Sequence, residues 1–485
     1  DEFTIKKSKL RGVESFGMIC AEDEIGIGTA HDGIIVLPEE AVPGTPAAEY
    51  YQLESDWLIE IDITANRADA LSHYGVARDL YAWLVQRGYK TSLHRPDCSA
   101  FHVDNENLPI DVVIENNEAC KRYACVSITD CEVKESPKWL QDKLNTIGLR
   151  PINNIVDITN YIMMAYGQPM HCFDADMVKG HKIVVRTQPE GTKFVTLDGV
   201  EHILGEHDLS ICNAEEPMCI AGIFGGKGSG TYETTKNVVL EAAYFHPTWI
   251  RKSARRHGLS TDSSFRFERG IDPNGTIYAL KQAAILCQQL AGGKVSMQIR
   301  DVYPNPLPDF DVNLKYEYCD RLIGKKLGAD TIKSIVTSLE MKIKHEDAEG
   351  LQLDVPAFRV DVQRPCDVIE DILRIYGYNN VEIPTQLKSS LTVQNDFDRE
   401  HKIEGVICEQ LVGCGFNEIL NNSLTKSTYY NHDEFNAYPW ANTVKVMNPL
   451  STDLGVMRQT MVFGGLESLA RNINRKRVNL KFFEL

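Results

Sequence analysis

The sequence has no long hydrophobic run, no regular cysteine spacing and no excess of basic residues. Since no apolar stretch approaches the roughly 20 residues that a membrane-spanning helix needs, we expect no membrane contact. The thirteen cysteines include no CxxC pair. This disfavours a zinc site or a disulfide framework and is typical of reduced thiols in a cytoplasmic protein. The first residues contain neither an initiator Met nor the apolar core of a signal peptide.

The charge balance limits the kinds of partner that the chain is expected to bind. A net charge of −17 disfavours a protein that coats nucleic acid non-specifically, so any such contact would need a local basic cluster. Three clusters are candidates, although each is more typical of a solvated face: Lys6, Lys7, Lys9 and Arg11; Arg251, Lys252, Arg255 and Arg256; Arg475, Lys476 and Arg477. An independent DNA-binding protein is disfavoured for the same reason, and no DNA partner is expected.

The length of 485 residues, with 43% hydrophobic and 25% charged residues, indicates a globular protein of several domains. The Pro-rich stretch VYPNPLPDF at 302–310 is the clearest boundary. Short strands at 17–28 and 32–44 predict an all-β start over residues 1–50. A helix is predicted over 71–86, and its apolar side is expected to contain Leu71, Val76, Leu80 and Leu84.

Both strands and helices are predicted farther along the chain, so the expected fold class is multidomain α+β. Before the boundary we expect a helix capped by Ser136 with Pro137 at its first position, a strand series over 182–211 with an Asp198–Gly199 hairpin, and a helix ending at two glycines, 292–293. Beyond the boundary we expect a helix over 330–343, a strand over 351–362, a helix over 367–378, a helix near Phe397 and a strand in the final NLKFFEL.

The stretch GQPMHCFDAD, 167–176, places His171 directly beside Cys172. Neighbouring residues project in different directions from a helix or a strand, so His171 is not placed to act as the base for Cys172. A Cys/His nucleophilic pair is therefore disfavoured. A ligand pocket that contains His171 is the preferred interpretation, with Cys172 as a bystander.

Four carboxylates lie within eleven residues: Asp361, Asp367, Glu370 and Asp371. Oxygen-only ligands suit Mg²⁺, which prefers hard donors. The spacing of Asp367 and Glu370 after Pro365 also fits the capping box of a helix. The pattern leaves both interpretations open.

The segment SSFRFERG, 263–270, contains Phe265-Arg266-Phe267-Glu268, which mimics the Phe-Arg-x-Glu signature of class II synthetase catalytic sites. Four such residues recur often by chance. An alternative is a strand in which Arg266 and Glu268 pair on one face.

A last group of polar residues is scattered through apolar surroundings such as NYIMMAYG and VVLEAAYF: Arg150, Thr159, Asn160, His171, Glu241 and Thr261. A carboxylate among apolar neighbours needs a partner. This is the first indication of a pocket in which a few polar groups converge on a ligand.

Three long motifs, at 148–174, 222–273 and 367–384, make the sequence resemble the β subunit of bacterial phenylalanyl-tRNA synthetase. The resemblance extends over essentially the whole chain in the expected order. The family β subunit is considerably longer, so the resemblance implies a fragment that starts inside one domain and stops inside another.

The resemblance implies a domain order. It consists of a partial OB-like tRNA-binding domain at 1–50, a B1-like α+β segment at 51–100, a mixed α/β B3/B4 proofreading domain at 101–305, a winged-helix-like B5 domain at 306–386 and a partial class II catalytic-like domain at 387–485. The Phe-Arg-Phe-Glu segment then lies in the proofreading domain and is not expected to bind ATP. The weaker class II resemblance lies later, at 448–475.

The resemblance also implies a function. An α subunit carries the ATP-dependent aminoacylation site, and two αβ pairs form an (αβ)₂ heterotetramer that binds phenylalanine tRNA. The B3/B4 domain would hydrolyse tyrosine mischarged onto that tRNA. Glu241 would accept the tyrosine hydroxyl and His171 would orient water or ribose, so both are expected to be catalytic. The expected pocket also contains Arg150, Thr159, Asn160, Gly225, Thr261 and Ser263, with Gly225 as a backbone donor to the developing oxyanion.

Two features of the resemblance leave questions open. Many relatives have Ala where this chain has Ser263, so the fine selectivity of the pocket is undecided. The four carboxylates match family positions that bind Mg²⁺ near the α subunit.

The alternative function is a non-catalytic tRNA-binding and assembly subunit whose pocket binds an aromatic amino acid without hydrolysis.

Overall fold

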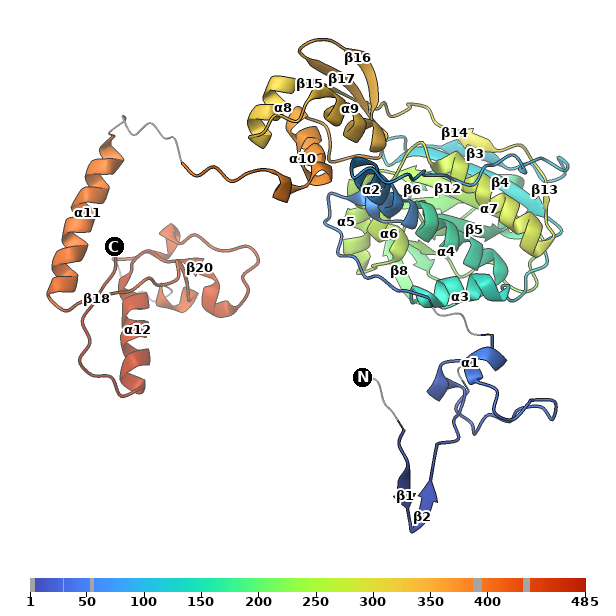
Figure 1. The fold of residues 1–485 in the computed structure, drawn as a ribbon, viewed down its shortest axis with the longest axis horizontal. Helices are drawn as coiled ribbons and strands as arrows, with labels where there is room; N and C mark the ends of the chain where they lie inside the picture. The colour runs from blue at the N-terminus through green and yellow to red at the C-terminus, as the bar shows by residue number, and fades with distance from the viewer. Residues whose placement is uncertain (1–4, 29, 53–55, 387–394, 431–436) are drawn as a thin grey trace. The chain divides into compact units, whose positions relative to one another are not determined.

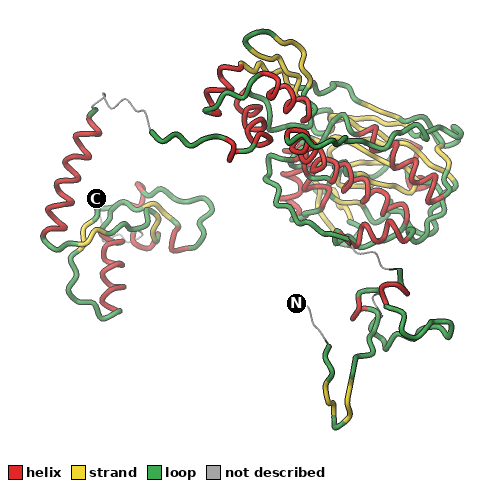
Figure 2. The backbone as a smooth tube through the Cα atoms, in the orientation of Figure 1, coloured by secondary structure: helices red, strands yellow, loops and turns green. Residues whose placement is uncertain are grey.

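The computed structural model describes residues 5–28, 30–52, 56–386, 395–430 and 437–485. The chain divides into two compact units, residues 1–382 and 383–485, whose elements are drawn in Figures 1 and 2. Within the described ranges, no helix is both long enough and apolar enough to cross a membrane. The domain start predicted at residue 387 lies outside the described residues.

The N-terminal part contains less β-structure than predicted. Strands β1 (Ser8–Leu10) and β2 (Val13–Ser15) form a hairpin, and a single helical turn, α1, spans Ala47–Tyr50. The predictions of strands in 17–28 and 32–44 are wrong, because these stretches find no neighbouring strand to pair with and no core to cover their apolar side chains. Ile19 and Val36, for example, are 72% and 83% exposed.

Helix α2 (His73–Gln86) confirms the predicted helix, but its predicted apolar side is wrong. The buried side chains are those of Arg78 and Ala82, while Leu80 is 53% exposed. The helix buries a charged group because ion partners surround it. The described part of the predicted α+β segment, 56–100, contains this helix and no strand.

The central domain is built around an antiparallel sheet in which β12 (Val238–Phe245) is the central strand. Every residue of β12 is buried, as its apolar sequence VVLEAAYF predicts. The other strands are β4 (Cys120–Thr129), β5 (Met170–Asp174), β13 (Lys294–Val295) and β14 (Arg300–Val302). Helices α4 (Asn154–Tyr166) and α7 (Thr276–Ala291) pack against this sheet (Figure 1).

A second five-stranded sheet shares the same hydrophobic core. Its order is β11 (Phe224–Gly225), β10 (Pro217–Ile220), β9 (Leu209–Cys212), β6 (Lys182–Thr187) and β3 (Asp111–Ile114), with a parallel pairing of β3 and β6. Strands β7 (Thr192–Val195) and β8 (Glu201–Leu204) form the predicted hairpin. Its turn contains Gly199 with a φ of +82°, which an L side chain rarely adopts.

Three further helices complete the central domain: α3 (Lys138–Thr146), α5 (Pro247–His257) and α6 (Asp262–Phe267). The predicted cap of α3 is wrong. Ser136 does not cap the helix, which begins after Pro137, because the Ser136 hydroxyl instead donates to the buried carboxylate of Asp157 at 2.6 Å. The helix that ends at two glycines is confirmed by α7.

The module that follows residue 309 has three helices and a three-stranded antiparallel sheet: α8 (Tyr316–Ile323), α9 (Ala329–Ser338), α10 (Pro365–Tyr376), β15 (Phe310–Lys315), β16 (Lys342–Glu346) and β17 (Gly350–Val355). The helix predicted over 330–343 ends at Ser338, where Glu340 adopts a φ of +64°. The strand predicted over 351–362 ends before Pro356, which has no backbone N–H to donate.

The described part of the second unit consists of residues 383–386, 395–430 and 437–485, and its first helix, α11 (Asp396–Gly413), confirms the helix predicted near Phe397. The other elements are α12 (Val462–Asn474) and two pairs of short strands: β18 (Asn417–Glu418) with β21 (Phe482–Phe483), and β19 (Leu424–Thr425) with β20 (Val456–Met457). The strand predicted in the final seven residues is thus confirmed over Phe482–Phe483.

Candidate functional site

A cavity of about 1390 Å³ lies in the central domain, among α4, β5, β11, the N-terminus of α6 and the loop at 230–236. Side chains from segments more than a hundred residues apart in sequence meet around it. Six of the eight predicted pocket residues line this cavity: Thr159, Asn160, His171, Gly225, Thr261 and Ser263.

A smaller chamber of about 50 Å³ adjoins the cavity and contains Glu241. The two spaces share the residues that form the neck between them: Met170, His171, Ile223, Phe224, Gly225 and Ser263. The rest of the chamber wall is mainly apolar, with Phe245 and Phe267 among its residues. The site is therefore a large outer cavity leading to a small, mostly apolar inner chamber.

Strand pairing brings the two predicted catalytic residues together. His171 on β5 lies directly opposite Glu241 on β12, and Glu241 in turn lies opposite Cys125 on β4. Residues that face each other across antiparallel strands project on the same face of the sheet. His171 and Glu241 thus lie side by side at the neck and in the chamber, although 70 residues separate them in sequence.

Glu241 is a buried carboxyl group without a protein donor. Its side chain is 4% exposed, and burial raises the pKa of its carboxyl to about 8. No residue in the described ranges donates a hydrogen bond to this side chain or pairs with it as an ion. At neutral pH the group is therefore mainly protonated, and its oxygens are free to interact with a polar group of a ligand.

His171 is held neutral by the same apolar surroundings. Desolvation lowers the pKa of its imidazole to about 4. Although part of the residue faces the cavity, its Nε2 atom is shielded from solvent and has no hydrogen-bond partner among the described residues. Such a nitrogen is suited to orient a water molecule or a ligand hydroxyl.

Gly225 leaves the space that His171 occupies. A Cβ atom at position 225 would lie 2.8 Å from His171 Cε1 and 2.9 Å from Leu197 Cδ1. Since real Cβ atoms do not approach other atoms this closely, a larger residue would displace the imidazole or close the neck. The glycine is thus required by the packing of the site.

The hydroxyl groups of the outer cavity are held by backbone contacts. Thr159 donates to the Val156 carbonyl oxygen at 2.7 Å. Thr261 donates to the Ile223 carbonyl oxygen at 3.0 Å and accepts from Ser264 N at 3.1 Å as the cap of α6. Each hydroxyl keeps a lone pair for a ligand. Asn160 lines the cavity, and no protein partner of its amide is found in the described part of the chain.

Of the residues named from the sequence, Arg150 lies outside this arrangement, and Cys172 borders the outer cavity without being a nucleophile there. Arg150 is exposed and lines neither the cavity nor the chamber. Cys172 is adjacent to His171 on β5, so its thiol projects from the opposite face of the strand. Burial raises the pKa of this thiol to about 12. It stays protonated at neutral pH and is no nucleophile.

The Phe-Arg-Phe-Glu segment forms the end of helix α6 and the residue after it. The alternative interpretation, a strand in which Arg266 and Glu268 pair on one face, is therefore wrong. The Arg266 guanidinium donates instead to Asp262 at 3.0 Å and to the Leu71 carbonyl oxygen at 3.2 Å, while Glu268 pairs with Arg269. Arg266 attaches α6 to the segment before α2 and does not face the cavity.

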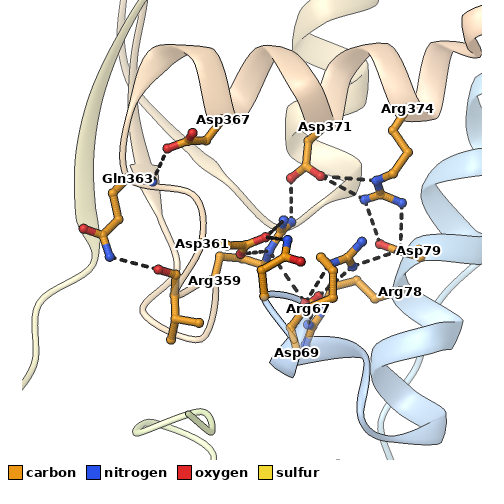
Figure 3. A network of polar contacts seen from close by, with 12 residues as sticks. Arg67, Asp69, Arg78, Asp79, Arg359, Asp361, Gln363, Asp367, Asp371 and Arg374 are labelled. Carbon is orange, nitrogen blue, oxygen red and sulfur yellow. Dashed lines mark hydrogen bonds and ion pairs between the residues drawn. The ribbon is translucent and has the colours of Figure 1, made fainter. Parts of the chain in front are cut away.

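Three of the four carboxylates predicted to bind Mg²⁺ form ion pairs with arginines. Figure 3 shows these three: Asp361, Asp367 and Asp371. Asp361 and Asp371 pair with the buried Arg359, and Asp371 also pairs with Arg374. Asp367 pairs with Arg364 and accepts from the backbone N–H of that residue, as the cap of α10.

Glu370, the fourth carboxylate, is exposed. Across the described ranges, no three His, Cys, Asp or Glu side chains are grouped so that they could hold a metal ion. The magnesium site predicted from this spacing does not fit the structure. The predicted capping box of Asp367 with Glu370 is wrong, because the helix begins two residues before Asp367, at Pro365, and the box is formed by Arg364 with Asp367. Guanidinium groups already neutralise the charges that an ion would need.

Sequence reasoning missed the aromatic and aliphatic residues that shape the site. Phe245 and Phe267 form the chamber wall, and Leu197 and Tyr232 line the outer cavity. Their apolar character gives no signal for a site by itself, because most such residues form the core. The glycine-rich run at 222–230 was the one available signal, since it marks a close approach of the backbone.

Comparisons with known proteins place these features in one family. Residues 119–292 match the B3/4 domain, 312–378 the tRNA synthetase B5 domain and 383–485 the phenylalanyl-tRNA synthetase β chain CLM domain. The phenylalanine–tRNA ligase β subunit of Bacteroides fragilis strain YCH46 is 66% identical over 482 residues, 99% of this chain. The chain belongs to the phenylalanyl-tRNA synthetase β subunit family.

More distant relatives carry the same description. The phenylalanine–tRNA ligase β subunits of Porphyromonas gingivalis strain W83 and Geobacter metallireducens are 51% and 40% identical, each over the whole chain. The chain spans 58–60% of the length of these relatives. It is a mixed α/β multidomain member of the family with a B3/4 and a B5 domain.

One solved structure, an N-terminal fragment of the phenylalanyl-tRNA synthetase β subunit from Pyrococcus horikoshii, is 18% identical with a TM-score of 0.35. The match covers 65% of this chain and 85% of the fragment.

Proposed function

We propose that this chain serves the cytoplasmic enzyme that attaches phenylalanine to its tRNA, as part of the β subunit. In this proposal an α subunit carries the ATP-dependent aminoacylation site, and the two subunits form an (αβ)₂ heterotetramer that binds phenylalanine tRNA. The identity to named β subunits over 99% of the chain supports the assignment. In this proposal residues 1–50 belong to an OB-like tRNA-binding domain, and residues 306–386, with three α-helices and a small sheet, to a winged-helix-like domain.

The proposed reaction of the central domain is hydrolysis of tyrosine mischarged onto the phenylalanine tRNA. A hydrophobic pocket that accepts phenylalanine rejects an analogue with one added hydroxyl by only about 10²-fold. A second pocket that requires the hydroxyl can correct the error. The observation that carries the proposal is Glu241, a buried carboxyl without a protein donor in a small, mostly apolar chamber.

The chamber distinguishes tyrosine from phenylalanine by hydrogen bonding. A tyrosine ring that enters the chamber beside Phe245 and Phe267, whose rings contact each other with centroids 5.0 Å apart, would bring its hydroxyl to the Glu241 carboxyl, where it donates to the carbonyl oxygen. Phenylalanine would leave this buried carboxyl without a partner, which costs about 1–3 kcal/mol in binding. Hydrolysis would then act mainly on the tyrosyl ester.

The ester of the bound amino acid would lie at the neck, beside His171 and Gly225. Neutral His171 orients the attacking water or the ribose hydroxyl through its free Nε2. The Gly225 N–H is a backbone donor for the oxyanion, and the absence of a side chain lets the ester approach. The hydroxyls of Thr159 and Thr261 and the Asn160 amide would bind the terminal adenosine in the outer cavity.

The test is release of tyrosine from Tyr-tRNA(Phe) by the complete αβ enzyme. We expect the unmodified enzyme to release tyrosine and to spare Phe-tRNA(Phe). Glu241→Ala should lose this preference, and His171→Ala should lower the rate for tyrosine at least tenfold. Glu201→Ala removes an exposed carboxylate of the same domain and should change neither rate.

Aminoacylation is measured in parallel to show that each variant is folded and assembled. If the unmodified enzyme charges tRNA normally but leaves Tyr-tRNA(Phe) intact, the hydrolytic function is wrong. The domain would then be the non-catalytic binding and assembly module, and binding of free tyrosine would be the next measurement.

A further inference from the structure

Tyr232 is an exposed aromatic residue that is nevertheless held firmly in place at the outer cavity. It is 51% exposed and lines that cavity. Its hydroxyl donates to the Lys227 carbonyl oxygen at 2.8 Å. Its backbone N–H donates to Thr235 Oγ1 at 3.1 Å, and Thr235 N donates back to the Tyr232 carbonyl oxygen at 2.9 Å.

These contacts continue into the buried part of the domain. Thr235 is 2% exposed, and its hydroxyl donates to the Asp174 carboxylate at the end of β5. A Cβ atom at Gly230 would lie 3.5 Å from Tyr232 Oη and 3.1 Å from Leu197 Cδ2. The Tyr232 ring therefore lies close to Gly230, and hydrogen bonds fix both the backbone and the hydroxyl of Tyr232. A surface tyrosine held in this way keeps one orientation without a ligand.

Two other exposed apolar side chains line the same cavity. Ile152 is 68% exposed and Leu197 is 44% exposed. Single exposed apolar residues are ordinary, but three around one cavity indicate a surface that a ligand covers. The cavity volume of about 1390 Å³ exceeds the roughly 300–1,000 Å³ of a site for one small ligand. There is room for more than an amino acid with one nucleoside.

The charges around this surface are mixed. Lys236 is exposed and has no carboxylate within 4.0 Å among the described residues. Lys134 is already paired with Glu132 at 2.7 Å. Glu135 accepts from Gln141, and Glu233 is exposed. Among the described residues that line the cavity, Lys236 is therefore the cation without a carboxylate partner, which fits one phosphate and not a broad polyanion surface.

We infer that this surface binds the unpaired RNA nucleotide that precedes the terminal adenosine of the substrate, with its base stacked on Tyr232 and its phosphate beside Lys236. This inference rests on the proposed function, which places the aminoacyl ester at the neck. Aromatic rings and a nearby cation are the usual means by which proteins bind single-stranded nucleic acid. A fixed ring stacks without the entropy cost of ordering a mobile side chain.

The test compares two substrates of the complete αβ enzyme: the tyrosyl ester of adenosine, and the tyrosyl ester of the trinucleotide CpCpA. Tyr232→Ala should lower kcat/KM about tenfold for the trinucleotide ester, mainly through KM, and leave the adenosine ester unchanged. Tyr232→Phe, which keeps the ring, should retain most of the activity. Tyr89→Ala, which removes an exposed tyrosine far from the cavity in sequence, is the matched control.

Lys236→Ala should weaken the trinucleotide ester alone and reduce the slope of log affinity against log salt by about 0.7. Lys193→Ala, on the exposed side of β7, should do neither. Equal losses for both esters in Tyr232→Ala would overturn the inference, because the residue would then act on the amino acid, the adenosine or the fold. Unchanged kinetics for both esters would overturn it as well.

Failure of the proposed function gives a different result. If the unmodified enzyme hydrolyses neither ester, the trinucleotide with a stable amide-linked tyrosine is used as a binding probe. Tighter binding of this probe than of tyrosyl-amide-adenosine, with the difference lost in Tyr232→Ala, would support the surface without hydrolysis. Equal binding of the two probes would reject the nucleotide surface.

Discussion

At the level of single residues, the site depends on two titratable groups that are both neutral at pH 7. Burial raises the pKa of Glu241 and lowers that of His171, although the two lie on adjacent strands. No ion pair forms between them in the structure. The chamber thus keeps a carboxyl and an imidazole available for a ligand, at a cost in stability that other contacts of the domain offset.

Glu241 should make the folding stability depend on pH. Between pH 4.5 and about 8 the folded state keeps the Glu241 proton and the unfolded state loses it. Stability contributed by this group therefore falls as pH rises through that window. Glu241→Gln should remove the dependence, so that its stability relative to the unmodified chain rises by roughly 3–5 kcal/mol from pH 4.5 to pH 8.

The measurement is denaturant unfolding of both proteins at several pH values, followed by fluorescence. His171 contributes the opposite sign between about pH 4 and 6.5, where the unfolded imidazole binds a proton and the folded one does not. This contribution is common to both proteins and cancels in the difference. A constant difference across the range would show that Glu241 is ionised in the folded chain.

Gly225 should be intolerant of even one methyl group. Gly225→Ala places a Cβ atom within 2.9 Å of both His171 and Leu197, so the imidazole must move or the neck must narrow. We expect tyrosine release to fall at least tenfold while aminoacylation is unchanged. Gly228→Ala, where a Cβ atom would meet nothing within 4 Å, should retain full activity in the same assay.

At the level of elements, helix α4 is attached by its first turn to two segments that precede it in the chain. The Asp157 carboxylate is fully buried and accepts from Ser136 Oγ at 2.6 Å and from Ile152 N at 2.8 Å. These bonds connect α4 to the residues before α3 and to the loop that enters the cavity wall. The orientation of Thr159 and Asn160 on the same helix follows from this attachment.

Asp157→Ala should therefore cost more than an ordinary surface substitution. It leaves the buried Ser136 hydroxyl and the part-buried Ile152 N–H without a partner, and we expect a loss of about 2–4 kcal/mol in the free energy of unfolding. Asp142→Ala removes an exposed carboxylate that pairs with Lys138 on α3 and should cost less than about 1 kcal/mol. Comparable losses for both variants in urea unfolding would argue against the anchoring role.

At the level of the whole molecule, an ion network joins helix α2 to the module at 312–378 (Figure 3). Arg359, which is 2% exposed, lies 2.6 Å from Asp371, 3.2 Å from Asp361 and 3.8 Å from Asp69. Arg374 bridges Asp371 and Asp79 of α2. The network belongs to a single compact unit that also contains the central domain.

Removal of the Arg359 guanidinium should destabilise the junction between helix α2 and the module at 312–378. Arg359→Met leaves the buried carboxylates of Asp69 and Asp371 without one of their cations, and we expect a loss of about 3–5 kcal/mol in unfolding free energy. Arg364→Met breaks an exposed pair with Asp367 and should cost less than about 1 kcal/mol. Thermal unfolding of the two variants provides the comparison, and equal melting temperatures would contradict the proposed role of Arg359.

The sequence by itself determined the elements whose pattern is local. Helices α7 and α11 and the hairpin at Asp198–Gly199 follow from periodicity and turn residues. Long motifs also identified the family and six of the residues that line the cavity, because a family carries its site in recognisable segments.

Only the tertiary structure decided which residues contact one another and which charged side chains are already in ion pairs. The register of β5 against β12 places His171 beside Glu241, and no local pattern fixes the pairing of strands so far apart. The arrangement of the carboxylates does not fit the magnesium prediction, because the arginines that neutralise them include Arg359, whose burial is a property of the fold. The strands predicted at 17–28 and 32–44 also depend on tertiary structure, because a strand needs a neighbouring strand that sequence pattern alone does not supply.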